Sequence, residues 1–303
     1  MLQDVNVEQV DRLDDFSQIE EVQRRTWGMT ETEVMPVHAL AAAHHHGGMV
    51  LAAYTPERRI VGFLLGLVGC RDEYAPLMGT PYYHQSFMMG VLPEFQGQGV
   101  GTALKLEQRR IALSQGYALA VWTYDPLLLP NAALNIGRLA TICRRYVRDA
   151  YGELSGINAG LNTDRFEVEW WLCSRRVERR LGNPEKKIPP QPHPAPSAFR
   201  RAGVPLINAA LMRTDGLPGP CDSFSLPRGE PRIQVEIPYD YHALRDADRG
   251  LARAWRDHAR ALFEAAFAGG YVVKYFGAEG GRAFYTLSTE ADIMALARGY
   301  DQG

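Results

Sequence analysis

A run of alternating glycines is the part of this 303-residue chain whose spacing most clearly indicates chemistry. Gly97, Gly99 and Gly101 lie in the stretch VLPEFQGQGVGTALKLEQRR, behind an apolar run and ahead of an amphipathic one. Glycine lets a backbone approach a ligand closely, and the first N–H groups of a helix are unpaired donors that favour an anion. The stretch therefore predicts a phosphate-binding loop at the start of a helix.

Three phosphate-loop patterns compete for these glycines. The pattern GxxxxGK[ST] does not fit, because Lys105 comes too late. The pattern GxGxxG counted from Gly97 also fails, because Thr102 stands in the place of its third glycine. The third pattern, Q/R-x-x-G-x-G/A, fits residues 96–101, and Pro93 precedes it. The alternative is a glycine-rich turn that only joins a strand to a helix.

This string resembles the acyl-CoA-binding signature of the GNAT superfamily of N-acyltransferases, over roughly residues 5–181. The resemblance implies acetyl-CoA or another acyl-CoA as co-substrate, with no metal. It assigns these residues to the cofactor loop: Gln96, Gly97, Gln98, Gly99, Val100, Gly101 and Thr102.

The resemblance also implies a site for the pantetheine arm of the cofactor. The strand ending at Val91 and the strand at residues 118–123 are expected to splay apart, and backbone groups near Met89 and Val91 would pair with the pantetheine amides. Asn131 or Asn135 lies where this superfamily often has an asparagine in contact with the arm. For Asn131 the alternative is a plain helix N-cap.

The order of expected elements is that of an α/β (α+β) GNAT fold, with a mixed central sheet flanked by helices. The periodicity predicts helices at residues 15–27, 101–116, 131–146 and 246–269. It predicts strands at residues 49–55, 59–69, 86–91, 117–124, 165–172, 232–238, 271–276 and 282–288, of which the first two and the last two form hairpins.

A proline-rich polar segment divides the chain. GNPEKKIPPQPHPAP indicates a linker or a loop on the surface. We therefore predict a GNAT acyltransferase domain at 1–181, a linker at 182–204 and a C-terminal α/β extension of strand-helix-strand-strand order at 205–303.

Composition and charge disfavour several other classes of protein. The net charge of -2 argues against a general binder of nucleic acid or of an anionic membrane. The longest apolar run, IVGFLLGLVG, is about half a membrane span, so it predicts a buried strand. The N-terminus is acidic and has no apolar signal core, so a cytoplasmic location is expected. The sequence leaves a homodimer open.

Metal sites and a cysteine nucleophile are also disfavoured. The four cysteines form no CxxC pair. The adjacent residues 44–46 are histidines, but neighbours on one helix cannot all face one ion. Acyl transfer from a thioester to an amine needs no covalent nucleophile, so Cys143 is interpreted as a core residue.

The reaction does require a neutral amine and a stabilised leaving thiolate. Tyr146 is the candidate acid, although it comes later than the tyrosine of the family, and Tyr124 is its rival. Glu94, beside the loop, and His84, ahead of the signature strand and acting through water, are the candidate bases. An ordinary structural or exposed side chain is the alternative for each.

A polar and aromatic group is the predicted acceptor pocket. Trp122 and Asp125 end one strand, and Arg165 begins another, where its guanidinium could clamp a carboxylate. The alternative for Arg165 is a turn with Asp164 that needs no ligand. Resemblance to a longer branch of the superfamily, with a C-terminal extension, suggests small-molecule amines, amino acids included. Acetyl and succinyl donors both stay open, because a succinyl tail would need a cation such as Arg138 or Arg165.

Two other functions stay open. A non-catalytic acyl-CoA-binding sensor would use the same loop. A protein N-acetyltransferase would use the same chemistry on a protein amine in an open groove.

Overall fold

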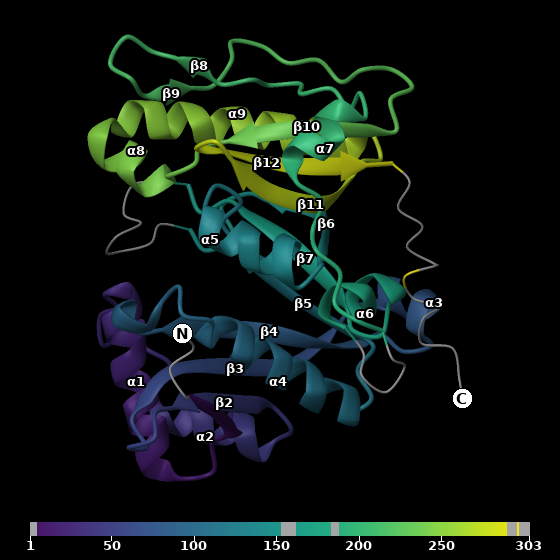
Figure 1. The fold of residues 1–303 in the computed structure, drawn as a ribbon. Helices are drawn as coiled ribbons and strands as arrows, with labels where there is room; N and C mark the ends of the chain where they lie inside the picture. The colour runs from purple at the N-terminus through teal and green to yellow at the C-terminus, as the bar shows by residue number, and fades with distance from the viewer. Residues whose placement is uncertain (1–4, 153–161, 183–187, 290–295, 297–303) are drawn as a thin grey trace. The chain divides into compact units, whose positions relative to one another are not determined.

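The computed structural model describes residues 5–152, 162–182, 188–289 and 296 (Figure 1). The chain forms two compact units, the first ending at Trp122 and the second beginning at Thr123. The domain boundaries predicted at 181 and 204 stay predictions.

The first unit is a sheet of strand order β1-β2-β3-β4-β5 with helices packed against it. Its strands are β1 (Asn6–Gln9), β2 (Met49–Tyr54), β3 (Ile60–Cys70), β4 (Tyr82–Val91) and β5 (Leu119–Tyr124), the last of which runs into the second unit. Its helices are α1 (Leu13–Trp27), α2 (Val37–His45), α3 (Ala75–Met78) and α4 (Val100–Ser114), with 3-10 turns at Asp72–Tyr74 and Pro93–Phe95. The pairings are antiparallel except that of β4 with β5, which is parallel.

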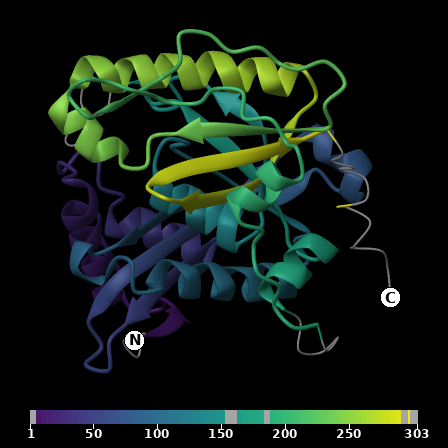
Figure 2. The same cartoon turned by 45° about the horizontal axis from the view of Figure 1, so that its top comes forward.

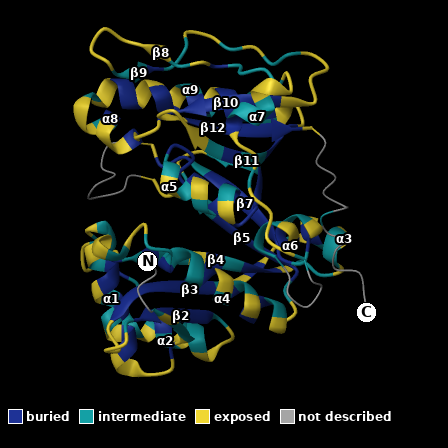
Figure 3. Ribbon diagram, in the orientation of Figure 1, coloured by how far each residue is buried: buried dark blue, intermediate teal, exposed yellow. Residues whose placement is uncertain are grey.

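Helices cover both faces of this sheet. Successive strand residues point to opposite faces. A Cβ on Gly62 of β3 would lie 3.2 Å from Val100 Cγ1 of α4, whereas the next residue, Phe63, packs edge-on against Trp27 of α1. This burial on both faces explains why β2 and most of β3 are apolar rather than alternating (Figure 3).

The second unit is an antiparallel sheet of strand order β7-β6-β11-β12-β10. Its strands are β6 (Ile142–Val147), β7 (Arg165–Trp171), β10 (Arg232–Ile237), β11 (Val272–Glu279) and β12 (Arg282–Ser288), and a short pair is formed by β8 (Leu211–Met212) and β9 (Pro218–Gly219). Its helices are α5 (Leu129–Ala132), a π-helical turn (Ala133–Arg138), α6 (Arg175–Leu181), α7 (Pro196–Arg201), α8 (Tyr241–Ala247) and α9 (Arg249–Ala268).

An aromatic core holds α9 to this second sheet. The ring of Phe166 on β7 lies 4.6 Å from that of Phe263 on α9 and 5.4 Å from that of Tyr285 on β12, measured between centroids. Figure 2 shows α9 as the long helix beside the C-terminal strands of this unit. The predicted helix at 246–269 is thus confirmed as α9, preceded by the separate helix α8.

The predicted fold class, a mixed sheet flanked by helices, is confirmed, but the helix predicted at 131–146 is wrong. It is replaced by α5, the π-helical turn and strand β6. Ala140 has a left-handed φ of 59°, which ends the helical turn, and Ile142 and Val147 of β6 then pair with β7. Cys143 and Tyr146 therefore lie on a strand. Asn131 is not an N-cap, because it lies within α5, which Leu128 precedes.

Three smaller differences concern the first unit and the segment before β10. The signature strand begins at Tyr82, so His84 lies within it rather than before it. The sequence did not predict β1 or α2. Helix α7 begins at Pro196, inside the segment predicted as a linker. In the part of the chain that is described, no helix is long and apolar enough to cross a membrane.

Candidate functional site

The glycine loop connects β4 to α4 and is held by its own glutamines. Gly97 and Gly99 have φ values of 73° and 92°, a region that favours glycine. Gln96 Nε2 donates to the carbonyl of Val91 at 3.0 Å, and Gln98 Nε2 donates to that of Glu94 at 2.7 Å. Both glutamine side chains therefore fix the loop rather than point to a ligand, and the backbone is left to make the contacts.

The backbone N–H groups at the start of α4 are available to an anion. The first helical hydrogen bond runs from Ala103 N–H to the carbonyl of Gly99 at 3.0 Å. The N–H groups of Val100, Gly101 and Thr102 have no hydrogen-bond partner among the described residues. Apart from Gly97 and its two chain neighbours, no atom of the described residues lies within 4 Å of the place a Cβ would take on Gly97. An open, side-chain-free helix N-terminus fits a pyrophosphate.

Strands β4 and β5 are paired over a short stretch only. The paired residues are His84 with Ala120 and Gln85 with Val121. Between β3 and β4 the register shifts so that Phe87 has no partner, which is a β-bulge. A bulge bends its strand and ends regular pairing. The rest of β4, residues 86–91, has no paired residue on β5, which fits the predicted entry of a pantetheine arm.

Met89 and Val91, predicted to pair with that arm, lie on the part of β4 that is not paired with β5, and both are half-buried. On its other edge β4 is paired with β3 here, Met89 with Leu64 and Val91 with Gly62. The carbonyl of Val91 already accepts the hydrogen bond from Gln96. Asn135 is buried in the π-helical turn of the second unit, where its carbonyl accepts from Thr141 N–H at 3.1 Å. The roles of these residues and of Asn131 stay predictions.

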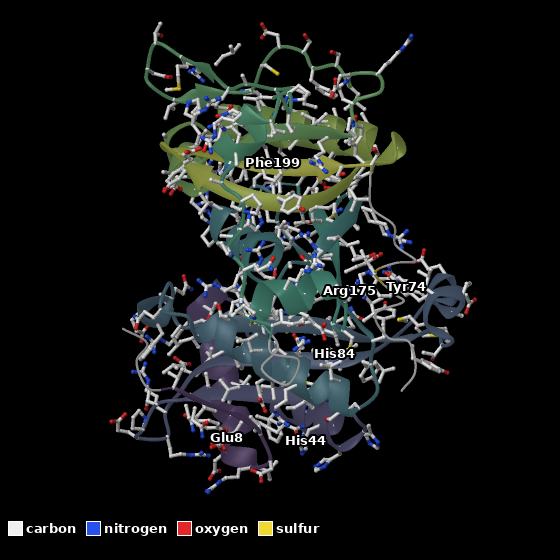
Figure 4. All side chains as sticks on the ribbon, turned by 45° about the vertical axis from the view of Figure 1, so that its right-hand side comes forward. Glu8, His44, Tyr74, His84, Arg175 and Phe199 are labelled. Atoms are coloured by element: carbon white, nitrogen blue, oxygen red, sulfur yellow. The ribbon has the colours of Figure 1, made fainter. Side chains whose placement is uncertain are left out.

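The two predicted bases are held in ways that weaken a base. Glu94 accepts from Arg25 and Arg59, at 2.9 Å each. Its pKa is lowered by a hydrogen bond to its own backbone and by these two arginines. His84 lies inside the first unit (Figure 4), where burial above all lowers its pKa to about 3. Neither group is suited to take a proton near neutral pH.

The two predicted acids are held in ways that weaken an acid. Tyr146 donates to Asp164 Oδ2 at 2.8 Å, and burial and that carboxylate raise the pKa of the phenol. Burial also raises the pKa of Tyr124, whose hydroxyl lies 3.2 Å from that of Tyr285. The contacts therefore do not favour either tyrosine as the group that protonates a thiolate.

Asp125 belongs to a buried ion pair in the second unit. Its two oxygens accept from Arg256 of α9 at 2.7 and 2.6 Å, and Oδ1 also accepts from Leu127 N–H at 2.9 Å. Burial raises the pKa of Asp125, but the pairing with Arg256 outweighs it, so the pKa lies below its usual value. Asp125 is therefore an ionised carboxylate whose negative charge is already paired with Arg256.

Arg165 keeps free donors beside this pair. Its Nη1 donates to the carbonyl of Asp164 at 2.9 Å and lies 3.8 Å from Asp125 Oδ2, and its guanidinium lies 5.4 Å from the centroid of the Tyr151 ring. Asp164 itself is paired in bidentate fashion with Arg260 of α9. The two carboxylates are thus matched by two arginines of α9, and Arg165 remains as an additional cation with Nε and Nη2 unpartnered among the described residues.

Sequence reasoning missed the α9 arginines. The available signal was Arg256 in the apolar stripe of that helix, between Ala252 and Ala259. Trp122, the third predicted acceptor residue, belongs to the first unit, where its ring faces Lys105 Nζ at 3.5 Å from the centroid.

The histidine run gives no metal site in the described part of the chain. His44 and His45 lie on α2 with their rings 5.5 Å apart. No group of at least three histidine, cysteine, aspartate or glutamate side chains suited to a metal ion occurs among the residues described.

Comparison with known proteins identifies the first part of the chain. Residues 13–130 match the family model of the acetyltransferase (GNAT) family. The chain therefore carries a GNAT acetyltransferase domain, and the predicted family and enzyme class, an acyltransferase, are confirmed. No curated protein sequence matches the chain.

Solved structures of similar proteins carry the same family name or activity. One is a putative GNAT acetyltransferase from Desulfovibrio desulfuricans, with 17% identity over 55% of this chain and 99% of that chain and a TM-score of 0.43. Another is the ribosomal-protein-S18-alanine N-acetyltransferase from Escherichia coli, with 13% identity over 55% of this chain and 92% of that chain and a TM-score of 0.41. A third is a putative acetyltransferase from Salmonella typhimurium with acetyl-CoA, with 14% identity over 56% of this chain and 94% of that chain and a TM-score of 0.43.

Proposed function

We propose that this protein is an acyl-CoA-dependent N-acyltransferase that moves an acetyl or succinyl group from CoA directly to the primary amine of a small molecule, amino acids included. The observation that carries the proposal is the open N-terminus of α4, which follows a bulged strand: the N–H groups of Val100, Gly101 and Thr102 have no hydrogen-bond partner in the part of the chain that is described. The pyrophosphate would bind these groups, and the pantetheine arm would follow the part of β4 that is not paired with β5.

Direct transfer suits a thioester. The acyl carbon is already activated, so two substrates held in order supply much of the rate by proximity. Cys143 supports this reading, because it is fully buried and burial raises its pKa, which disfavours an attacking thiolate.

Arg165 supports an acceptor that carries a carboxylate. Asp125 and Asp164 are paired with Arg256 and Arg260, and Nε and Nη2 of Arg165 have no partner among the described residues. A planar guanidinium with two adjacent N–H groups matches a carboxylate. Free amino acids have both the amine to be acylated and the carboxylate to be clamped.

Cofactor placement is tested by Gly101→Glu. The new carboxylate would occupy the anion position, so we expect the affinity for CoA, measured by calorimetry, to fall at least about 100-fold. Gly250→Glu is the matched control, because Gly250 is likewise the second residue of its helix, α9. Unchanged affinity in a folded Gly101→Glu protein would contradict the placement.

Activity is tested by the release of free thiol from acetyl-CoA and succinyl-CoA with a panel of D- and L-amino acids and polyamines. For Arg165→Ala we expect a higher KM for an amino acid, with no change for the matching amine that lacks the carboxylate and no change in CoA affinity. An equal effect on both acceptors would show that Arg165 does not read the carboxylate.

The second candidate is a non-catalytic acyl-CoA sensor. The contacts of Glu94, His84 and Tyr146 favour it, because none of these groups is poised for proton transfer. Tight CoA binding with no acceptor-dependent thiol release would support this candidate.

A further inference from the structure

A buried lysine lies where β4 and β5 separate. Gln85 and Val121 are the last paired residues, and the next residues on the two strands are Ser86 and Trp122. Lys105 of α4 contacts both of these next residues: its Nζ lies 2.8 Å from Ser86 Oγ and 3.5 Å from the centroid of the Trp122 ring. The amino group of Lys105 therefore lies where the pairing of β4 with β5 ends, at the start of the part of β4 along which the pantetheine arm is proposed to bind.

Lys105 has no carboxylate partner among the residues that the structure describes. It is 1% exposed, and its third contact is Gln108 Oε1 at 3.1 Å. Within the described chain, the groups facing it are Ser86 and His84 from β4, Gln108 from α4 and Trp122 from β5. Burial lowers the pKa of Lys105 well below its ordinary value. A buried ammonium without a counterion is costly, so the neutral amine is favoured.

The neighbouring histidine is fixed as a neutral group. Because Gln108 Oε1 accepts from Lys105, its Nε2 is directed to His84 Nε2 at 2.8 Å, and that ring nitrogen must accept. The proton of the neutral ring is then on Nδ1. His84 cannot take up a further proton at Nε2 without losing this hydrogen bond, which leaves Lys105 as the basic group of the cluster.

Gly66 makes room for the cluster. A Cβ on Gly66 of β3 would lie 2.3 Å from Cε1 of the His84 ring. Gly66 thus leaves space for the His84 ring, and Gln108 fixes both the ring and the Lys105 amine by hydrogen bonds.

We propose that Lys105 accepts the proton that the acceptor ammonium must lose, with the Ser86 hydroxyl as the link between them. This inference rests on the proposed function and names the base that the reaction needs.

In this step the ammonium gives one proton to Ser86 Oγ while the hydroxyl proton of Ser86 moves to Lys105 Nζ. The freed nitrogen lone pair attacks the thioester carbonyl carbon. The C–S bond then breaks with its electron pair on sulfur, and the sulfur takes a second proton from the nitrogen. The products are the amide and the free thiol, and Lys105 returns its proton to water through Ser86. The net reaction releases one proton.

The test is the pH dependence of kcat/KM for two acceptors whose amines differ in pKa. We expect the acidic limb of the wild-type profile to be the same with both acceptors, because it reports Lys105. In Lys105→Met we expect kcat/KM to fall by about 100-fold. The acidic limb of its pH profile should then differ between the two acceptors and follow the pKa of each amine. Ser86→Ala, which keeps the lysine, should behave in the same way. Lys274→Met on β11, the matched control, should keep the wild-type profile.

Calorimetry of CoA binding accompanies each variant and separates the outcomes. Unchanged CoA affinity with the altered pH profile supports the proposal. Wild-type rate and limb in Lys105→Met overturn the role of Lys105 while the proposed function stands. If Lys105→Met loses CoA affinity, Ser86→Ala decides, and a wild-type profile in that variant overturns the relay. A wild-type protein that binds CoA but transfers to no acceptor overturns the proposed function and the relay together.

Discussion

The buried pair of Asp125 and Arg256 links the end of β5 to α9, and breaking it should destabilise the protein strongly. The two side chains share two hydrogen bonds of 2.7 and 2.6 Å. Arg256 is 2% exposed, and Asp125 is 9% exposed. Arg256→Met would leave the carboxylate with Arg165 Nη1, at 3.8 Å, as its nearest cation. Asp125→Ala would leave the guanidinium over the ring of Tyr241, at 5.1 Å from its centroid, without the carboxylate that accepts its two hydrogen bonds.

The expected magnitude follows from this geometry. Removing one partner of a buried pair costs about 3–5 kcal/mol, because the other charge is left uncompensated. Asp125→Ala also removes the acceptor of Leu127 N–H, which adds about 1 kcal/mol. The double variant removes both charges of the pair, so neither is left without its partner. The loss of unfolding free energy in the double variant should therefore be smaller than the sum of the losses in the two single variants. We expect the difference, which is the coupling between the two side chains, to be about 3 kcal/mol.

Urea unfolding followed by circular dichroism and by tryptophan fluorescence measures these differences. A control pair at the surface, Arg200→Met and Glu279→Ala, should show coupling of about 1 kcal/mol or less, because both side chains are exposed although they lie 3.0 Å apart. Additive effects of Asp125→Ala and Arg256→Met, within about 0.5 kcal/mol, would refute the reasoning, because independent sites add.

Two further predictions concern the buried cluster of the first unit. Gly66→Ala places a Cβ 2.3 Å from the His84 ring and should lower the free energy of unfolding by about 1–3 kcal/mol. The control Gly250→Ala should not, because among the described residues only Asp248 Oδ1 lies near its Cβ. Equal melting temperatures for wild type and Gly66→Ala would contradict the clash. The pKa of His84 is lowered from 6.5 to about 3, so the unfolded state binds a proton that the folded state does not, and stability should decline as the pH falls below 6.5, by up to about 1.4 kcal/mol per pH unit. His84→Asn should lose this slope in urea titrations at several pH values, and an unchanged slope would assign the effect to other groups.

The sequence by itself determined the features that depend on neighbouring residues. Gly97 and Gly99 predicted the loop before α4, because only glycine adopts their backbone angles easily. The hairpins of β2 with β3 and of β11 with β12 were predicted for a similar reason, since each is two strand-like runs joined by a short polar turn. These signals are local, and the family resemblance of the glycine string reinforced them.

Tertiary structure decided what depends on distant partners. Residues 142–147 have a spacing that is compatible with a helix, but pairing with β7 and β11 makes them strand β6. Asp125 is paired with Arg256, which lies 131 positions away in the sequence, and Lys105 is hydrogen-bonded to Ser86, which lies 19 positions away. Whether an arginine or a lysine is solvated, paired or left as a buried amine depends on which groups the fold brings to it. Desolvation and charge pairing arise only when distant segments meet, so the chemistry of these cations was not readable from the sequence.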